Sequence, residues 1–249
     1  MMLAFTSTLH DPENRLGYLI EKVGGPLRSL FDSATVAYTP QTHPDIIKLL
    51  ANNRFSVYKA GDSVISTYQT AFNNALNNNL SSLFYCDLDR ALHWMRSYPE
   101  ELKQITQTPS NHDFILIGRT KRAFDTHPQT QTLTEGIGNV VASKVLGFKK
   151  TSDILGTTWI LTLQLAKMIL EQKPMNEFSF YTEWPIMLWR TSSNPLYTER
   201  EGLEWETPDR YVREIKTQGE EVWKQGFQTV NEWKRRTLML KDFIESMAI

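Results

Sequence analysis

A short apolar run that ends in two acids constrains this chain more than any other stretch; it reads Leu83-Phe84-Tyr85-Cys86-Asp87-Leu88-Asp89. Four apolar residues bounded by polar ones predict a buried strand, and side chains alternate along a strand, which would send Asp87 and Asp89 to the same side. Unpaired buried carboxylates are costly, so the two acids are poor core material. They are hard oxygen ligands of the kind that Mg²⁺ or Mn²⁺ prefers when the ion carries a diphosphate. The alternative is a pair of solvated acids that merely follows a strand.

The composition limits what else the chain can be. It has 249 residues, 41% of them hydrophobic, which is enough for one globular domain with a sizeable core. The formal net charge of -1 gives no reason to expect a nucleic-acid partner. The single cysteine, Cys86, predicts a buried thiol in a reducing compartment. The longest apolar stretch, 154–170, contains Thr, Gln and Lys side chains and is expected to form a buried helix. We therefore expect a soluble, cytoplasmic protein without a secretory signal.

The first half of the chain alternates strand-like and helix-like segments. Strands are predicted at Leu3–Thr8, Ala34–Tyr38, Phe55–Lys59 and the run before Asp87, with helices at Glu13–Val23, after Pro44 and after Gly61-Asp62-Ser63. Gly24-Gly25-Pro26 is expected to end the first helix and Asn77-Asn78-Asn79 the third. This alternation is typical of a parallel sheet with crossover helices. The double acid then lies at the carboxyl end of the fourth strand, the edge where open α/β sheets bind ligands.

Four further segments, taken in order with the double acid, resemble one family. They are Thr6–Leu16, Ile117-Gly118-Arg119, Gly138-Asn139 through Leu146-Gly147, and Asp153–Gly156. Their order resembles that of the GT-A nucleotide-sugar glycosyltransferases, and the chain is most similar to the group that includes the dolichyl-phosphate mannose synthases. The resemblance covers roughly residues 3 to 207. It implies a GT-A, Rossmann-like α/β domain, with a mostly parallel sheet flanked by helices, that transfers a sugar from a nucleoside diphosphate donor with inversion.

The resemblance also implies roles on the donor side of such a site. The metal ligands would be Asp87 and Asp89, holding Mg²⁺ or Mn²⁺, and the donor-binding residues Asp11, Lys59, Asp87 and Arg119. Within the pair, Asp89 is preferred as the direct metal ligand. Lys121 and Arg122, next to Arg119, could also neutralise the diphosphate or an acidic acceptor, and their alternative is an exposed basic loop. The alternative for Asp11 is a turn residue before Pro12.

Two acids in the second half are the candidates for catalysis on the acceptor side. Asp153 matches the aspartate that the family places near the acceptor pocket, and its alternative role is to cap the helix predicted from Ile154. Glu183 lies among aromatic residues, which would raise the pKa of its carboxyl and suit it to act as general base for a hydroxyl acceptor. Its alternative role is that of a surface acid beside packed core aromatics. The acceptor itself stays open among a sugar, a small molecule and a lipid phosphate.

Two other functions compete with transfer. The aspartate that the family usually carries after its second strand is absent, since Ala37-Tyr38-Thr39 stands there, which leaves open a catalytically inactive GT-A-like protein that binds or assembles. A sugar-nucleotide pyrophosphorylase on a related sheet would need a Gly-rich loop with a cation after the first strand, and Thr6–Leu9 supplies none.

From Pro208 onward the chain changes character. Apolar residues recur at helical spacing, with Gly219 as a break: Val212, Ile215, Val222, Val230, Trp233, Thr237, Leu240 and Ile244. The sequence therefore predicts a domain over 1–207 and an amphipathic helical extension over 208–249. We expect the extension to pack on its own domain. A homodimer contact and a peripheral membrane contact, through the basic residues around Trp233, are the alternatives.

Overall fold

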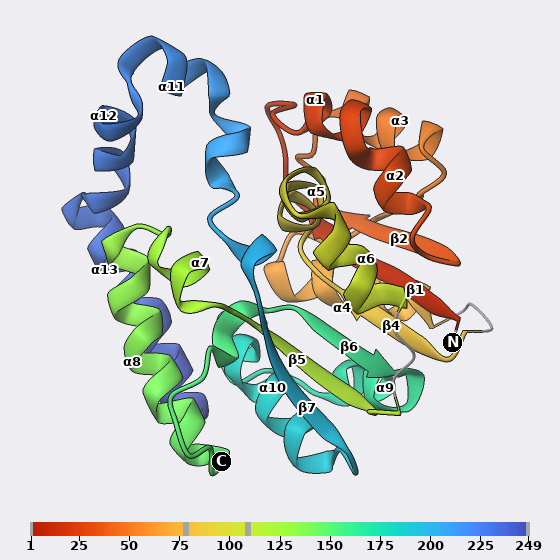
Figure 1. Ribbon diagram of the computed structural model, residues 1–249, viewed down its shortest axis with the longest axis vertical. Helices are drawn as coiled ribbons and strands as arrows, with labels where there is room; N and C mark the ends of the chain where they lie inside the picture. Colours follow the sequence, from red (N-terminus) through yellow and green to blue (C-terminus); the bar gives the residue numbers. More distant parts are fainter. Residues whose placement is uncertain (1, 77–79, 108–110, 248–249) are drawn as a thin grey trace.

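A seven-stranded sheet runs through the centre of the computed structural model, which describes residues 2–76, 80–107 and 111–247 (Figure 1). Its strands are β1 Leu3–Leu9, β2 Ser33–Tyr38, β3 Ser56–Lys59, β4 Ser82–Tyr85, β5 Phe114–Arg119, β6 Trp159–Thr162 and β7 Pro195–Arg200, in the order β3-β2-β1-β4-β6-β5-β7. All neighbours are parallel except β6, which is antiparallel to both β4 and β5. The predicted α/β class with a mostly parallel sheet is confirmed. The expected stop at Asn77–Asn79 lies outside the described residues.

Helices cover both faces of this sheet (Figure 1). One face carries α1 Gly17–Leu19, the π-helical turn Ile20–Gly24, α2 Gly25–Arg28, α3 Pro44–Asn52, α5 Leu88–Ser97 and α6 Pro99–Gln107; the other carries α4 Val64–Ala75, α9 Leu163–Glu171 and α10 Phe180–Thr191. Alternation along β4 divides its side chains between the two cores. Phe84 packs with the first set of helices, whereas Leu83 and Tyr85 pack with the second. A strand buried on both faces explains why this run is apolar throughout.

The double acid does not sit on the strand that precedes it. β4 ends at Tyr85, Asp87 takes the N-cap position of α5, and Asp89 lies in the first turn of that helix. The expectation that strand alternation aligns the two acids is therefore wrong. A strand-to-helix turn brings them to the same edge instead.

Two helix boundaries also differ from the sequence prediction. Gly24-Gly25-Pro26 does not end the first helix: the helical backbone begins at Gly17 and continues through a π turn into α2, where Pro26 occupies the first turn and needs no N–H partner. The stretch 154–170 is not one helix. It forms a 3₁₀ turn at Ile154–Gly156, then β6, then α9. Thr157 adopts a left-handed conformation with φ of 50° that turns the chain into the strand.

The C-terminal half supplies a second helical layer beside the sheet (Figure 1). Its elements are α7 Lys121–Asp125, α8 Gln129–Val145, the 3₁₀ turns Glu201–Leu203 and Thr207–Arg210, α11 Val212–Gln218, α12 Glu220–Gln225, the 3₁₀ turn Gly226–Gln228 and α13 Val230–Ser246. α13 packs against α8 and α10. The predicted break at Gly219 is confirmed, since its φ of +86° separates α11 from α12.

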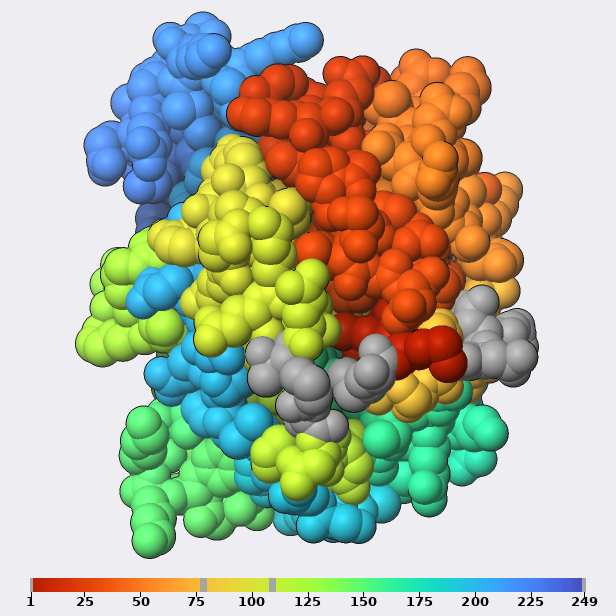
Figure 2. Space-filling model, turned by 45° about the vertical axis from the view of Figure 1, so that its right-hand side comes forward, coloured from red at the N-terminus to blue at the C-terminus, as the bar shows by residue number. Residues whose placement is uncertain are grey.

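The buried side chains of the C-terminal extension are not the ones that the spacing predicted. Met239, Phe243 and Met247 are buried, whereas Val222 and Val230 are 55% and 83% exposed. Figure 2 shows the C-terminal segment, in blue, beside the N-terminal segment, in red. Arg15 joins them, because its Nη1 donates to the backbone oxygen of Arg210 at 3.2 Å. No helix in the described ranges has both the length and the apolar character needed to cross a membrane.

Candidate functional site

A cavity of about 460 Å³ opens at the carboxyl ends of β1, β2 and β4. The chain passes from β1 outward to β2 and β3 on one side, while β4 lies on the other side of β1, so the cavity sits where the strand order reverses. Open α/β sheets bind their ligands at such points. The residues that matter for its chemistry are Thr8, Tyr68, Asp87, Asp89, Glu206 and Arg210. The last two belong to the segment that follows β7.

Asp87 is held at the floor of this cavity by hydroxyl groups. Its Oδ1 accepts hydrogen bonds from the hydroxyls of Tyr85 at 2.6 Å, Thr8 at 3.1 Å and Tyr68 at 3.3 Å. Among the described residues no hydrogen bond reaches Oδ2. Burial raises the pKa of the Asp87 carboxyl, and the charge of Asp89 adds to this, while the nearby Arg90 and the hydroxyls oppose it. Asp87 therefore has one fixed oxygen and one oxygen left for a ligand.

Asp89 faces the same cavity but has a cationic partner. Its Oδ1 accepts from the backbone N–H of Arg90 at 2.9 Å, and its Oδ2 lies 3.3 Å from Nη1 of Arg210. Arg210 also donates through Nη2 to the backbone oxygen of His10 at 2.9 Å. Its Nε is buried and has no partner among the described residues. A guanidinium group is thus positioned beside the acid pair.

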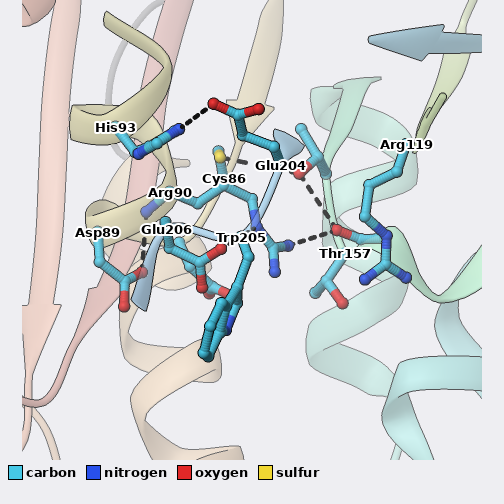
Figure 3. A network of polar contacts seen from close by, with 12 residues as sticks. Cys86, Asp89, Arg90, His93, Arg119, Thr157, Glu204, Trp205 and Glu206 are labelled. Carbon is cyan, nitrogen blue, oxygen red and sulfur yellow. Dashed lines mark hydrogen bonds and ion pairs between the residues drawn. The ribbon is translucent and has the colours of Figure 1, made fainter. Parts of the chain in front are cut away.

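Glu206 lines the cavity, and Arg90 lies beside it without lining the cavity itself (Figure 3). Arg90 donates through Nη1 to the backbone oxygen of Gly156 at 2.6 Å, and its Nε lies 3.8 Å from Oε2 of Glu206, too far for a hydrogen bond. Within the described parts of the chain both of these atoms are buried and unpartnered. Burial raises the pKa of the Glu206 carboxyl against the opposing charge of Arg90. Buried polar atoms left unpaired at a cavity are where a ligand or ordered water is expected.

The acid pair suits one mode of metal binding and not another. No group of three or more His, Cys, Asp or Glu side chains that could hold a metal ion occurs in the described ranges. An all-protein metal cage is therefore not present there. Mg²⁺, however, commonly binds through one or two carboxylates and completes its shell with waters and substrate phosphates. Asp87 and Asp89 fit that mode, although Arg210 competes with a cation for Asp89.

Two predicted donor-binding residues take other positions. Asp11 is fully buried and accepts from the backbone N–H groups of Arg15 at 2.9 Å and Leu16 at 2.8 Å, which is the turn role left open for it. It does not line the cavity. Lys59 is exposed at the end of β3 and does not line the cavity either.

Arg119 and Asp153 are brought together, but neither of them lines the cavity. Oδ2 of Asp153 accepts from Nε of Arg119 at 2.7 Å, and Oδ1 accepts from Nη2 at 2.8 Å; Nη2 also reaches Glu135 at 2.7 Å. The side chains of Arg119 and Asp153 are 1% and 7% exposed. Burial opposes ionisation of Asp153, yet Arg119 outweighs it and lowers the pKa of the carboxyl. In this structure the pair is a buried ion pair, unavailable to a diphosphate or an acceptor. Nor does Asp153 cap a helix through its side chain.

The two basic neighbours of Arg119 are exposed and pair with acids. Arg122 pairs with Glu201 and, at 2.5 Å, with Glu204, and Lys121 pairs with Asp125. This is the exposed basic loop left open for them.

Glu183 is separated from the acid pair. It lines a second cavity of about 430 Å³ and accepts from the backbone N–H of Met175 at 3.0 Å. Among the residues that the structure describes, none lines both cavities. Tyr181, two positions earlier on α10, does face the first cavity, and burial raises the pKa of its hydroxyl to about 12. Helix geometry turns residues two apart in different directions, which is why Glu183 points elsewhere.

Sequence reasoning missed Glu206, Arg210 and Tyr68. The ring of Tyr68 packs in the core beneath α4, and no spacing in the sequence reveals that its hydroxyl reaches Asp87. Glu206 and Arg210 lie far from Asp87 in the sequence. The available signal in the sequence is the group of acids Glu204, Glu206 and Asp209 around the start of the extension.

No family model matches this chain, and no curated protein matches it. A solved structure described as the crystal structure of a mycobacterial protein is similar at a TM-score of 0.48 and 12% sequence identity, over 79% of this chain. This chain spans about 65% of the length of that one.

Proposed function

We propose that this protein transfers a sugar from a nucleoside diphosphate-sugar to an acceptor, in the cavity at the ends of β1, β2 and β4. The observation that carries the proposal is the convergence of Asp87, Asp89 and Arg210 on one cavity at the switch point of the sheet. Its volume of about 460 Å³ is within the usual range for small-molecule sites. The GT-A resemblance in the sequence points the same way.

The lining divides into two parts that suit the two parts of such a donor. Leu9, Leu16 and Val64 offer apolar contact beside the polar groups of Thr39 and Asp62, as a nucleoside with apolar faces and polar edges requires. Asp87, Asp89 and Arg210 suit the diphosphate. A bound Mg²⁺ or Mn²⁺ would neutralise charge on the leaving diphosphate. Arg210 adds a guanidinium, whose planar fork matches phosphate oxygens, beside the same acids.

Glu206 replaces Glu183 as our candidate general base. It lines the donor cavity, whereas Glu183 does not. Its raised pKa makes its carboxylate a better proton acceptor than an ordinary surface acid. An acceptor hydroxyl that entered the cavity would give its proton to Glu206 as it attacks the sugar. Arg90 then keeps the carboxylate charged before the reaction and in place during it.

Calorimetry with uridine and guanosine diphosphates, with and without Mn²⁺, tests the donor site. We expect Asp89→Asn to lose the Mn²⁺-dependent part of the binding while the melting temperature, Tm, changes little, because the side chain is partly exposed. The matched control is Asp125→Asn, an exposed acid outside the cavity that should bind like the wild type. Equal Mn²⁺ dependence in Asp89→Asn and the control would contradict the metal assignment.

Transfer is tested separately from binding. Glu206→Gln keeps the size of the side chain and removes the proton acceptor, so donor turnover should fall by roughly a hundredfold or more at nearly unchanged donor affinity. Glu183→Gln, in the second cavity, is the control and should keep its turnover. If the wild type binds the nucleotide but neither hydrolyses nor transfers the sugar, the inactive GT-A-like alternative is favoured. Formation of a nucleotide-sugar and pyrophosphate from a sugar phosphate and a nucleoside triphosphate would favour the pyrophosphorylase.

A further inference from the structure

The segment 204–210, which carries Glu206 and Arg210, is held along one face of α5 by a row of ion pairs. Asp89 pairs with Arg210, Arg90 faces Glu206, and Arg96 pairs with Asp209 at 2.6 Å. The helix that begins with the two cavity acids therefore also fixes the segment that closes the cavity. Both ends of the site depend on α5.

His93 is the central member of this row. Its Nδ1 lies 2.8 Å from Oδ2 of Asp209, and its Nε2 lies 3.2 Å from Oε1 of Glu204, the contact drawn in Figure 3. The His93 side chain is 5% exposed, and Asp209 is nearly as buried, at 8%. Glu204 and Asp209 flank Glu206 in the sequence, so one imidazole ring bridges the two ends of the stretch that contains the candidate base.

Only the protonated ring satisfies both contacts. An imidazolium donates from both nitrogens, whereas a neutral imidazole has one N–H and one lone pair, which would face a carboxylate oxygen at hydrogen-bond distance. In a buried position that unmatched contact is costly. The neutral ring would therefore release one of the two carboxylates.

We propose that His93 is a positioning residue: its imidazolium bridges Glu204 and Asp209 and so keeps the segment 204–210, with Glu206 and Arg210, on the wall of the donor cavity. The bridge itself stands on the geometry of α5 and this segment. Only the identity of the ligand used to test it rests on the proposed function.

Charged groups reach His93 from several elements. Arg96, one turn later on α5, lies 3.3 Å from Nδ1 and opposes protonation, as does burial of the ring. Asp209 and Glu204 favour protonation and outweigh both, so the pKa of His93 is raised above its ordinary 6.5. From α7, Arg122 pairs with Glu204 at 2.5 Å, and from the start of α6, Tyr98 donates to the same carboxylate at 3.2 Å. When the bridge opens, Glu204 therefore keeps these two partners and Asp209 keeps Arg96, so the segment loses its central contact and is held less tightly.

The direction of the pH dependence follows from the raised pKa. The bridge is fully formed below pH 6.5, the ordinary pKa of histidine, and is lost as the pH rises through the higher pKa of the folded protein. Nucleotide binding should therefore weaken on the alkaline side. The reason is that a smaller fraction of the molecules then keeps Arg210 beside the acid pair.

The experiment compares pH profiles rather than single affinities. Binding of guanosine or uridine diphosphate with Mn²⁺ is measured by calorimetry between pH 6 and 9 for the wild type, His93→Gln and His112→Gln. Ionisation of the nucleotide and of Mn²⁺-bound water is common to all three proteins, so the difference between profiles isolates His93. His112 precedes β5 at the opposite edge of the sheet, which makes its variant the matched control.

We expect wild type and His112→Gln to lose affinity by about tenfold more than His93→Gln over this range, and His93→Gln to start about tenfold weaker at pH 6. Identical profiles for His93→Gln and His112→Gln would overturn the proposal. Should His93→Gln not fold, Asp209→Asn removes the same contact from the other side and must flatten the profile in the same way.

A ligand-free measurement separates this proposal from the proposed function. The imidazole ¹⁵N resonances of the wild type should give His93 a pKa above 6.5, and Asp209→Asn should lower it. If no nucleotide binds at any pH but this titration behaves as described, the donor assignment fails and the bridge stands. A His93 that titrates at or below 6.5 overturns the bridge, whether or not nucleotides bind.

Discussion

Ionisation of the buried Asp87 carboxyl costs free energy because the charge is removed from water. Three hydroxyls stabilise one oxygen, yet burial dominates and the pKa of the carboxyl is raised. A raised pKa in an acid means that the folded protein holds its proton more tightly than the unfolded chain. The contribution of this group to stability therefore falls as the pH rises from 3.8 through the folded pKa. Groups that cost stability in this way are frequent at functional sites.

The first consequence is that Asp87→Asn should stabilise the protein at pH 7. The amide oxygen can still accept from Tyr85, Thr8 and Tyr68, and the variant has no charge to desolvate. We expect a rise in Tm of about a few degrees at pH 7 that shrinks towards pH 4, together with the loss of Mn²⁺-dependent nucleotide binding. Thermal unfolding followed by circular dichroism at both pH values measures it. A lower Tm at pH 7 would show that Asp87 is there for its contacts rather than its charge.

At this scale the sequence predicted part of the site. Asp87 and Asp89 could be found because an acid pair directly after an apolar run is visible within seven residues. Asp11 and Arg119 were predicted to bind the donor and Asp153 to act in catalysis, but the structure engages Asp11 in a turn and the other two in a buried ion pair. A sequence does not reveal which acids already have partners. Glu206 depends on how the chain returns after β7, which no local pattern records.

Among the elements, the corner between α11 and α12 rests on one residue. Gly219 has φ of +86° and ψ of 148°, a conformation that residues with a Cβ rarely adopt. A methyl group there would meet no atom within 4 Å, so a substitution would cost backbone strain alone. The corner determines where the last helices lie relative to the segment 204–210.

Gly219→Ala should therefore lower the free energy of unfolding by about 1–3 kcal/mol, or unfold the α11–α12 corner locally. Gly136→Ala is the matched comparison, because Gly136 lies inside α8 with equally open space around its Cα. There alanine favours the helix and should stabilise by about 0.5–1 kcal/mol. Urea unfolding of the two variants measures both signs, and equal effects would show that backbone conformation is not the cause.

The stretch 154–170 shows why element boundaries were harder to predict than the fold class. Its apolar residues satisfy a helical spacing, but Thr157, Thr158 and Ile160 are β-branched, and the structure places a strand there between two strands of the sheet. The hydrogen bonds that β6 makes to β4 and β5 outweigh the helical spacing of its apolar residues. The parallel first half was predictable because each strand is followed by a crossover helix. The antiparallel strand β6 departs from this strand–helix alternation.

For the whole molecule, α13 acts as the cover of the second core. Met239, Phe243 and Met247 are each less than a tenth exposed and pack with residues from α8 and α10. Removing residues 229–249 would expose this face while keeping Glu206 and Arg210. Burying a side chain of this size contributes about 1.5–3 kcal/mol, so three of them approach the stability of a typical domain.

We therefore expect the protein truncated after residue 228 to melt far earlier or to aggregate, as measured by Tm and light scattering. An exposed apolar residue of the full-length protein provides the contrasting case. Val230→Ser, at a side chain that is 83% exposed, should leave Tm within about 1 °C of the wild type. A truncated protein that stays folded and changes from dimer to monomer would make α13 an assembly element. One that stays folded and loses only its affinity for anionic vesicles would make it a membrane contact.

The cavity at the ends of β1, β2 and β4 is built from segments that lie far apart in the sequence, because Thr8 to Asp89 supply most of its lining and Glu206 and Arg210 join it from the segment after β7. A ribosome adds about 5–20 residues per second, so on the order of 10 s separates the appearance of Asp89 from that of Arg210. In that interval a nascent chain contains Asp87 and Asp89 but lacks the guanidinium of Arg210 and the candidate base Glu206. On the proposed function, an incomplete or proteolytically cleaved polypeptide could bind a metal ion but could not turn over the donor. On this proposal the reaction would begin only after Glu206 and Arg210 have been made and have folded onto α5.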